Sequence, residues 1–362
     1  MRTIQTISAL SLASALAAQG VVSPAHFTQA ECNTYAYVGI GSTSTPDRVL
    51  QVHDDLKGTA RTIGSVAFRR DASLTSSSYD YAAYNILCDI ILSNAATTSA
   101  SISTTFDVNH GANKTQVASF KLAAFPATKH KRGSEPFDYK ILFTTPYAFD
   151  GSTGLCFEIK VNSKTNTQTV YLDYQSTTVS TNPYAYDEYT GTGCKATGYT
   201  SPMFMQGSSN PNWPANSLTL GWTGSSLPKN ALGYLCLGAS DQTWSSLALP
   251  FALPGTSSAP SGTCTVYCDW SVQIPALSNA TGGLTQNFGF QANPSWNGQS
   301  IYSQLVFVDA AANSWGAVMT NRVQHQVIAP YTLVPVSICY AQGSLALTGT
   351  VQKNGGFPTL FQ

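Results

Sequence analysis

The side chains that could do chemistry are few and scattered. The five histidines, at positions 26, 53, 110, 130 and 325, show no spacing of the His-Glu-x-x-His kind that holds a metal ion. The Gly-x-Ser-x-Gly turn of an α/β hydrolase does not occur. The triplet His53-Asp54-Asp55 puts an imidazole beside two carboxylates, but adjacent residues of a strand point to opposite faces. We interpret it as a solvated group at a strand end, so the sequence predicts no catalytic residue, cofactor or metal.

Carboxylates that could work in pairs are also rare. The candidates are Glu135, Glu158, Asp187 and Glu188, and glycoside hydrolysis would need two of them within about 5–10 Å. Glu158 alternates onto the polar side of a predicted strand, where a cross-strand partner such as Lys140 is the ordinary explanation. Asp187 and Glu188 offer the oxygen ligands that calcium prefers, but no regular calcium-loop motif surrounds them. An exported hydrolase with an unrecognised site is kept as one alternative.

The tryptophans are the most suggestive feature, and all six lie beyond residue 212. An exposed indole offers a flat, weakly polar face on which a sugar ring can stack. Three stand beside Pro, Asn, Ser or Gly in predicted loops, where binding residues concentrate: Trp213, Trp244 and Trp296. The other three lie in or beside predicted strands and are expected in the core: Trp222, Trp270 and Trp315. The alternative, that all six are buried, follows from the usual burial of large aromatic side chains.

Eight cysteines indicate a disulfide framework, because their number is even and the chain starts with an export signal. They are Cys32, Cys88, Cys156, Cys194, Cys236, Cys264, Cys268 and Cys339. Four precede residue 212 and four follow it, so each half could close two bridges, with the pairing left open. A zinc site at Cys264-x-x-x-Cys268 is disfavoured, since no second pair or set of histidines accompanies it.

The elements that must position these side chains are strands. Residues 137–143 and 155–161 place large apolar side chains at every second position, with a turn over 144–151 between them. This period is typical of strands with one buried face, and we predict an antiparallel pair. Further candidate strands are 61–71, 84–92, 117–122, 169–174, 218–222, 232–237, 264–270, 284–290 and 315–321. The segment 301–309 has apolar residues on both faces and is expected to be a strand covered on both sides. The predicted fold class is all-β, with two antiparallel β-sandwich or jelly-roll-like domains and little helix.

Composition divides the chain. Turn residues dominate 190–214, and beyond residue 212 there are only three basic and three acidic residues. We predict an N-terminal sandwich over 29–210, a C-terminal sandwich over 213–330 and a strand-like tail over 331–362. The tail would complete the second sheet or pair elsewhere.

Residues 1–18 have a positive start, a short apolar run and Ala-x-Ala, and are predicted to be a cleaved signal peptide. No later run reaches the ~20 apolar residues of a membrane span. The net charge is zero and charged residues make up 10% of the chain, which argues against a nucleic-acid partner because phosphates require a basic surface. We expect a secreted, extracellular or cell-surface protein.

Several short motifs resemble a set of exported proteins of planctomycete-type bacteria. They are Phe68-Arg-Arg-Asp71, Phe137-Asp-Tyr139, Phe143-Thr-Thr-Pro146-Tyr147, Leu247-Ala-Leu-Pro250-Phe251 and the run from Tyr302 to Asn321. In that set the second half resembles a recurrent C-terminal β module, and the likeness covers most of residues 60–321. The resemblance implies export and a β fold, but no activity and no functional residues. The chain departs from it after Val327.

The function that we predict is therefore that of a non-catalytic extracellular or cell-surface protein that binds glycans or other surface proteins. Its glycan contacts would be the loop tryptophans at 213, 244 and 296. A structural subunit that polymerises by adding the tail as a strand to a neighbouring copy is the first alternative.

Overall fold

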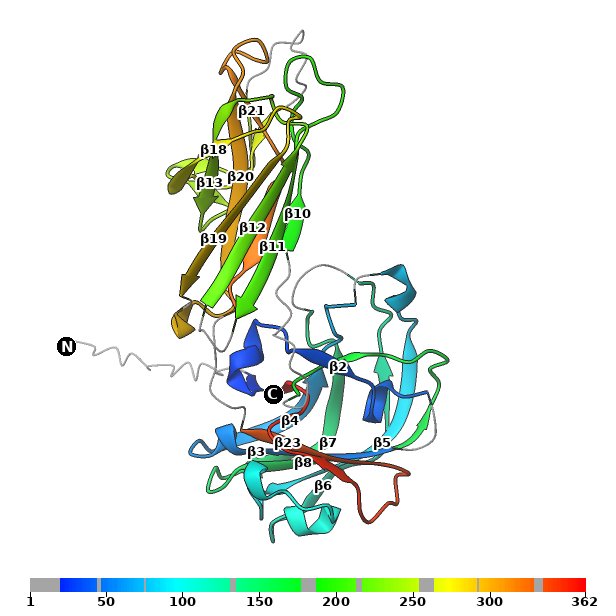
Figure 1. The fold of residues 1–362 in the computed structure, drawn as a ribbon. Helices are drawn as coiled ribbons and strands as arrows, with labels where there is room; N and C mark the ends of the chain where they lie inside the picture. The colour runs from blue at the N-terminus through cyan, green and yellow to red at the C-terminus, as the bar shows by residue number, and fades with distance from the viewer. Residues whose placement is uncertain are drawn as a thin grey trace, which may run out of the picture.

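The computed structural model describes residues 20–43, 47–74, 76–130, 135–176, 187–212, 217–253, 264–291, 293–328 and 335–362. The predicted signal peptide and Trp213 lie outside these ranges. The described residues form strands joined by loops and seven short 3-10 helices, grouped in two bodies (Figure 1). The all-β prediction is confirmed. No helix of the described residues is both long enough and apolar enough to cross a membrane.

Two facing sheets make the first body. One contains, in spatial order, β1 (Val21–Ser23), β25 (Thr359–Phe361), β4 (Arg61–Phe68) and β7 (Tyr139–Phe149). The other contains β24 (Thr350–Gln352), β23 (Val336–Gln342), β3 (Asp47–His53), β8 (Leu155–Lys164), β5 (Tyr84–Asn94) and β6 (Thr115–Phe125). A separate pair joins β2 (Thr34–Ala36) to β9 (Leu172–Tyr174).

The core of the first body lies between these sheets. Alternate side chains of β4 and β7, such as Phe68 and Ile141, pack against Ile90, Phe157 and Ile159 of the larger sheet. Each is at most 3% exposed. The period-two pattern of the sequence therefore arises because each strand turns one side to this shared core.

The predicted pair at 137–161 is corrected. Its two strands exist, but β7 pairs only with β4, while β8 pairs with β3 and β5 of the opposite sheet. The chain crosses between sheets at residues 150–154 instead of forming a hairpin. Strand β7 also continues through Pro146, where a turn was predicted. A proline is tolerated there because β7 is an edge strand with an unpaired side.

The second body is a sandwich of two further sheets. One contains β10 (Asp187–Thr190), β22 (Arg322–Gln326), β20 (Ser300–Val308), β13 (Leu232–Gly238) and β18 (Val272–Leu277), with β21 (Ala317–Met319) beside β20. The other contains β11 (Phe204–Asn212), β12 (Ser217–Ser225) and β19 (Leu284–Gln291). Two short pairs, β14 (Thr243–Trp244) with β15 (Leu247–Ala248) and β16 (Phe251–Ala252) with β17 (Thr265–Val266), lie outside them. The core includes Leu220, Trp222, Leu235 and Phe307.

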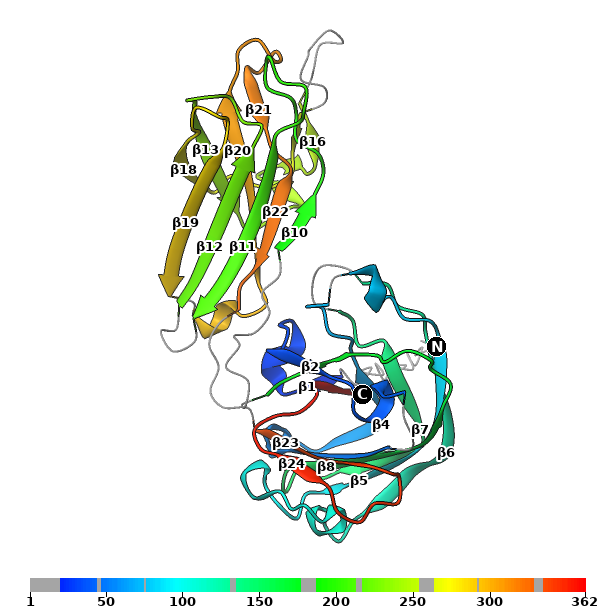
Figure 2. The ribbon, with the colours of Figure 1, turned by 45° about the vertical axis from the view of Figure 1, so that its right-hand side comes forward.

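Strand pairing corrects the predicted boundaries. Strands β10 and β11, assigned from sequence to the first domain, pair with β22 and β12 of the second. The tail returns to the first body, where β23 lies between β24 and β3 and β25 lies between β1 and β4 (Figures 1 and 2). The second body is thus inserted into the first. Both edges of β23 and of β25 are therefore paired within the chain, whereas β24, also part of the tail, is the edge strand of its sheet.

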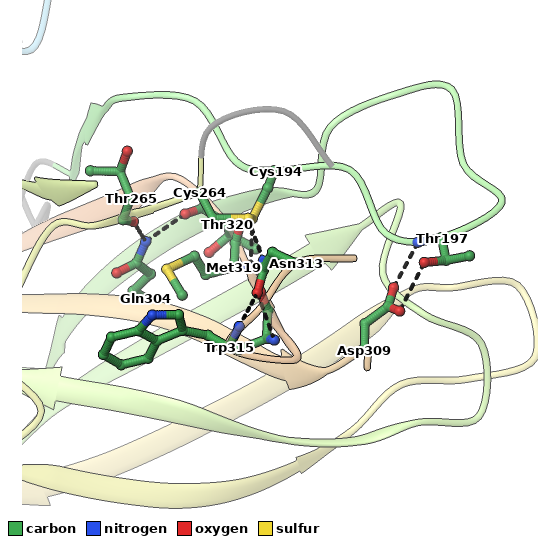
Figure 3. Close-up of a disulfide and its surroundings, with 11 residues drawn as sticks. Cys194, Thr197, Cys264, Thr265, Gln304, Asp309, Asn313, Trp315, Met319 and Thr320 are labelled. Carbon is green, nitrogen blue, oxygen red and sulfur yellow. Dashed lines mark hydrogen bonds between the residues drawn. A yellow bond between two sulfur atoms is a disulfide. The ribbon is translucent and has the colours of Figure 1, made fainter. Parts of the chain in front are cut away.

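One disulfide is present among the described residues, and it joins Cys194 to Cys264 (Figure 3). It lies within the second body, although the sequence assigned its two cysteines to different halves. Met319 holds it in place, since its N–H donates to the Cys194 sulfur at 3.0 Å while the Cys194 N–H donates to the Met319 carbonyl at 2.9 Å. The bridge therefore ties the segment before β11 and the start of β17 to strand β21.

The other six cysteines are a second correction, because each is a buried free thiol: Cys32, Cys88, Cys156, Cys236, Cys268 and Cys339. The sheet topology explains why Cys156 and Cys339 are not bonded to each other. Cys156 and Cys339 lie on β8 and β23, the two neighbours of β3, opposite Val52 and Leu50. Their separation is therefore two strand spacings, about 9.6 Å, plus an offset of two residues along the strands. Disulfides form across Cα distances below about 7 Å.

Candidate functional site

A cleft of about 710 Å³ opens on the first body, between the segment around β2 and the hairpin of β23 and β24. We call it the tyrosine cleft. Its lining includes Tyr35, Tyr37, Asp47, Tyr340, Thr348 and Thr350. Its volume lies in the range of small-molecule sites, roughly 300–1,000 Å³.

The local sequence Tyr35-Ala36-Tyr37 presents two rings to the cleft. Period-two alternation along the extended chain places both side chains on one side. Their faces are partly open, with Tyr35 45% and Tyr37 49% exposed. Both rest edge-on against Tyr171, at centroid distances of 4.8 Å and 5.9 Å. The rings are thus fixed by packing while much of each surface stays accessible.

The charged group of the cleft is already neutralised. Asp47 is 5% exposed, and its carboxylate accepts a hydrogen bond from Nζ of Lys164 at 2.9 Å. Burial lowers the pKa of Lys164, although the pairing with Asp47 opposes this. Thr348 and Thr350 belong to the remaining lining. A ligand would therefore meet aromatic faces and hydroxyl groups with little net charge.

The hairpin side of the cleft is held firmly. Nη1 of Arg48 donates to the Ala346 carbonyl at 2.6 Å, and the Gly349 N–H donates to the Thr104 carbonyl at 2.8 Å. The loop between β23 and β24 presents Leu345 and Leu347 to solvent, 85% and 72% exposed. Both walls of the tyrosine cleft are consequently pre-formed, which reduces the entropy cost of binding.

Of the tryptophans predicted to bind, Trp244 and Trp296 are described by the structure, and they pack against different aromatic residues. Trp244 is half-buried against Trp270, with ring centroids 4.6 Å apart. Trp296 is 43% exposed on the short helix η7 (Pro294–Trp296), near Phe290. Neither lines the tyrosine cleft.

Of the tryptophans predicted to lie in the core, one behaves differently. Trp222 is 1% exposed and Trp270 is half-buried. Trp315, however, is 59% exposed at the turn before β21. The side-chain oxygen of Asn313 shapes this turn by accepting a hydrogen bond from the backbone N–H of Trp315 at 3.0 Å. The indole ring of Trp315 remains exposed to solvent.

A Ser–His–Glu chain lies inside the first body, and sequence reasoning missed it. Oγ of Ser93 is 2.8 Å from Nδ1 of His110, whose Nε2 is 2.8 Å from Oε2 of Glu158. Nε and Nη2 of Arg48 also donate to the Glu158 carboxylate, so the expected partner Lys140 is wrong. Burial pushes the pKa of Glu158 upward, but hydrogen bonds from His110 and Arg48 outweigh it and leave the pKa below its ordinary value.

The Ser93–His110–Glu158 hydrogen-bond series does not form an accessible active site. Ser93 and Glu158 are 0% exposed, because a small second core covers the outer face of the larger sheet. That cover, which includes Phe106 and Ile102, also explains why both faces of β8 are buried. A substrate could reach the Ser93 hydroxyl only if this layer opened. We assign the group a structural role.

A second group of this type lies in the second body. Nδ1 of His325 is 2.5 Å from Oδ1 of Asp187 and 3.2 Å from Oγ of Ser209. The His325 ring packs edge-on against Trp222 and is fully buried. Oγ of Ser209 also donates to Oδ1 of Asp187 at 2.8 Å, so both His325 and Ser209 engage this carboxylate. The calcium interpretation of Asp187 and Glu188 gains no support from this geometry.

Three buried carboxylates form the only group of possible metal ligands found among the described residues: Glu31, Asp71 and Asp173. Arg69 lies within the group and donates twice to Asp173, at 2.8 Å and 2.6 Å. Burial, followed by the nearby Asp173, raises the pKa of Glu31 well above its usual range and that of Asp71 to about 7. One guanidinium and bound protons can balance three carboxylates, so the arrangement does not require a metal ion.

The structure defines the chain as an all-β protein of two sandwiches, one inserted into the other. No family model, curated protein or solved structure matches the chain. The resemblance to exported planctomycete-type proteins therefore stays a prediction. Any functional assignment has to come from the sites themselves.

Proposed function

We propose that this chain is an exported, non-catalytic binding protein of the cell surface or extracellular matrix, and that it binds a neutral glycan in the tyrosine cleft. Export is supported by the signal-like residues 1–18 and by the Cys194–Cys264 bond, since disulfides persist in oxidising compartments.

The observation that carries the proposal is the pair Tyr35 and Tyr37, about half exposed and fixed by Tyr171 at the wall of a 710 Å³ cleft. The apolar face of a sugar ring stacks on aromatic side chains that are held rigidly and whose ring faces are exposed. Tyrosine also adds a hydroxyl that can hydrogen-bond to sugar hydroxyls.

Charge favours a neutral ligand over an anionic one. Asp47 is paired with Lys164, so the cleft offers no free cation from that pair to hold a phosphate or sulfate. A neutral glycan gives up water on entering such a site, and polar residues of the lining, such as the tyrosines and threonines, offer hydrogen bonds in its place. An extended peptide is the competing ligand, and the binding assay below distinguishes the two.

The test is binding of the full chain to a panel of neutral polysaccharides and oligosaccharides, with unrelated extended peptides alongside. The double variant Tyr35→Ala/Tyr37→Ala should weaken glycan binding, since each lost aromatic contact is worth about 1 kcal/mol, roughly fivefold in Kd. The matched control is Trp296→Ala, which removes an exposed aromatic ring away from the cleft. Loss of binding in the control and not in the tyrosine variant would restore the tryptophan hypothesis. Failure to bind any glycan would remove the ligand from the proposal.

A further inference from the structure

A cluster of polar side chains lies in the interior of the first body, where its two sheets face each other. Ser23, Gln51, His53 and Thr359 are all 0% exposed. Ser23 and Thr359 are directly opposed on β1 and β25 of one sheet, while Gln51 and His53 share a face of β3 in the other. Buried polar groups cost free energy unless they are paired, so this cluster calls for an explanation.

Gln51 and Thr359 touch across the two sheets. Nε2 of Gln51 is 3.1 Å from Oγ1 of Thr359, and Oε1 of Gln51 accepts the Phe357 N–H at 2.7 Å. The backbone donor fixes which end of the amide is oxygen. A Cβ on Gly356 would lie 2.5 Å from that oxygen, so glycine is needed there for Gln51 to enter. Oγ1 of Thr359 is thus held beside Nε2 of Gln51, which is bonded to the side-chain amide carbon Cδ.

His53 was predicted to belong to a solvated group, but it is 0% exposed. It provides an unprotonated nitrogen in the same cluster. The Ser23 hydroxyl donates to Oδ1 of Asp55 at 2.5 Å, so its oxygen accepts the Nδ1–H of His53, 2.8 Å away. The lone pair of His53 then lies on Nε2, which has no hydrogen-bond partner among the described residues. Burial lowers the pKa of His53 to about 3, so the ring is neutral at physiological pH.

We propose that Thr359 and Gln51 react within the folded chain to form an intramolecular ester. Oγ1 of Thr359 attacks the side-chain amide carbon of Gln51, and the Phe357 N–H holds the oxygen on which negative charge develops. At rest the Thr359 hydroxyl donates to the Phe357 carbonyl at 3.1 Å. For the reaction it turns from that acceptor to the unpartnered Nε2 of His53, which accepts the proton and returns it to the departing nitrogen. The C–N bond breaks, one ammonia leaves and one C–O bond forms. No oxidant, reductant or added reactant is required.

Burial favours both the attack and the survival of the product. The partners are held by the packed sheets, which replaces an encounter in solution by a fixed geometry. Water, the reagent that would hydrolyse the ester, has little access to side chains that are 0% exposed. The bond would join β25, the last described strand, to β3 of the opposite sheet. Residues 51–359, which include the whole inserted second body, would then form one covalently closed loop of the chain.

Peptide mass spectrometry of the purified full chain tests this inference. The expected product is a linked pair of peptides, one containing Gln51 and the other Thr359, lighter than their sum by one ammonia and cleaved by alkaline hydroxylamine. Thr359→Ser should keep the link, whereas Thr359→Val, of nearly the same volume, and Gln51→Glu should lack it. His53→Phe should leave a larger unlinked fraction.

Two outcomes would overturn the proposal. One is recovery of separate, unmodified Gln51 and Thr359 peptides from the folded wild-type chain. The other is a link that persists in Thr359→Val, which would place the reaction elsewhere. If Thr359→Val fails to fold, the wild-type peptides and Thr359→Ser still decide, because both retain the hydroxyl.

Discussion

The ring of Phe361 lies edge-on against the ring of His53, with centroids 5.1 Å apart. These residues belong to β25 and β3, which are in opposite sheets and far apart in the sequence. Phe361 is also paired with Val21 of β1. Because the first and last described strands are neighbours, the first body can complete its core only after the inserted second body has been synthesised.

Truncation of this ring should destabilise the first body strongly. Phe361 is 2% exposed and belongs to the main core, and large-to-small changes of buried Phe cost about 3–5 kcal/mol. We expect Phe361→Ala to lower the free energy of unfolding by that amount, measured by urea denaturation. The control is Leu345→Ala, which removes an 85% exposed side chain and should change stability by about 0.5 kcal/mol or less. Equal effects of the two would contradict the placement of β25.

The buried pair of Arg48 and Glu158 should be costly to break. Both side chains are at most 3% exposed, and they are 2.8 Å apart at Nε and Oε1. Arg48→Ala leaves the Glu158 carboxylate without its main charge partner, and removing one member of a buried pair costs about 3–5 kcal/mol. Lys114→Ala, which removes the exposed partner of Asp107, should cost about 1 kcal/mol or less. Denaturation midpoints of the two variants measure the difference.

Stability should fall as pH rises through the range in which Asp71 titrates. Burial, and then Asp173, raises the pKa of Asp71 to about 7, against the contrary effect of hydrogen bonds from Ser73. The fold therefore favours the protonated form. The contribution is fully present below about pH 4, the ordinary pKa, and is lost as pH rises to about 7. Glu31, whose pKa burial also raises, acts in the same direction.

Asp71→Asn should remove this dependence. The variant carries a neutral side chain at every pH, so its stability relative to wild type should increase between about pH 4 and pH 8. Melting temperatures of wild type, Asp71→Asn and Glu31→Gln across this range give the measurement. Parallel curves for the three proteins would show that the carboxylates are ionised in the fold without cost.

Sequence patterns predicted the elements better than their partners. Alternation located β4, β5, β6, β12 and β13, because alternate side chains of each are buried in a local core. The same pattern cannot say which strand lies beside which, and so the crossing between β7 and β8 was interpreted as a hairpin. The partner of the tail, β3, is separated from it by nearly the whole chain, and nothing in the local sequence of β23 encodes that contact.

The candidate site shows a similar limit. Tyr35-Ala36-Tyr37 carries a readable signal, two aromatic residues on one side of an extended segment, but the opposite wall comes from residues around Tyr340. The burial of Glu158 depends on the cover supplied by Phe106 and its neighbours. Such features depend on long-range packing, which composition and periodicity do not reveal.

The disulfide should matter to the second body alone. Cys194 and Cys264 are separated by 70 residues. In the chain-entropy model, closing a loop of that length lowers the entropy of the unfolded chain and so stabilises the folded state by about 4 kcal/mol. Reductant should therefore lower the melting temperature of the second body, and Cys194→Ser should have the same effect and abolish the response to reductant. Cys268→Ala, which removes a buried free thiol of the same body, should keep that response. Differential scanning calorimetry with and without dithiothreitol separates these cases, and a response to reductant that depends on Cys268 would show that the bridge forms with a different partner.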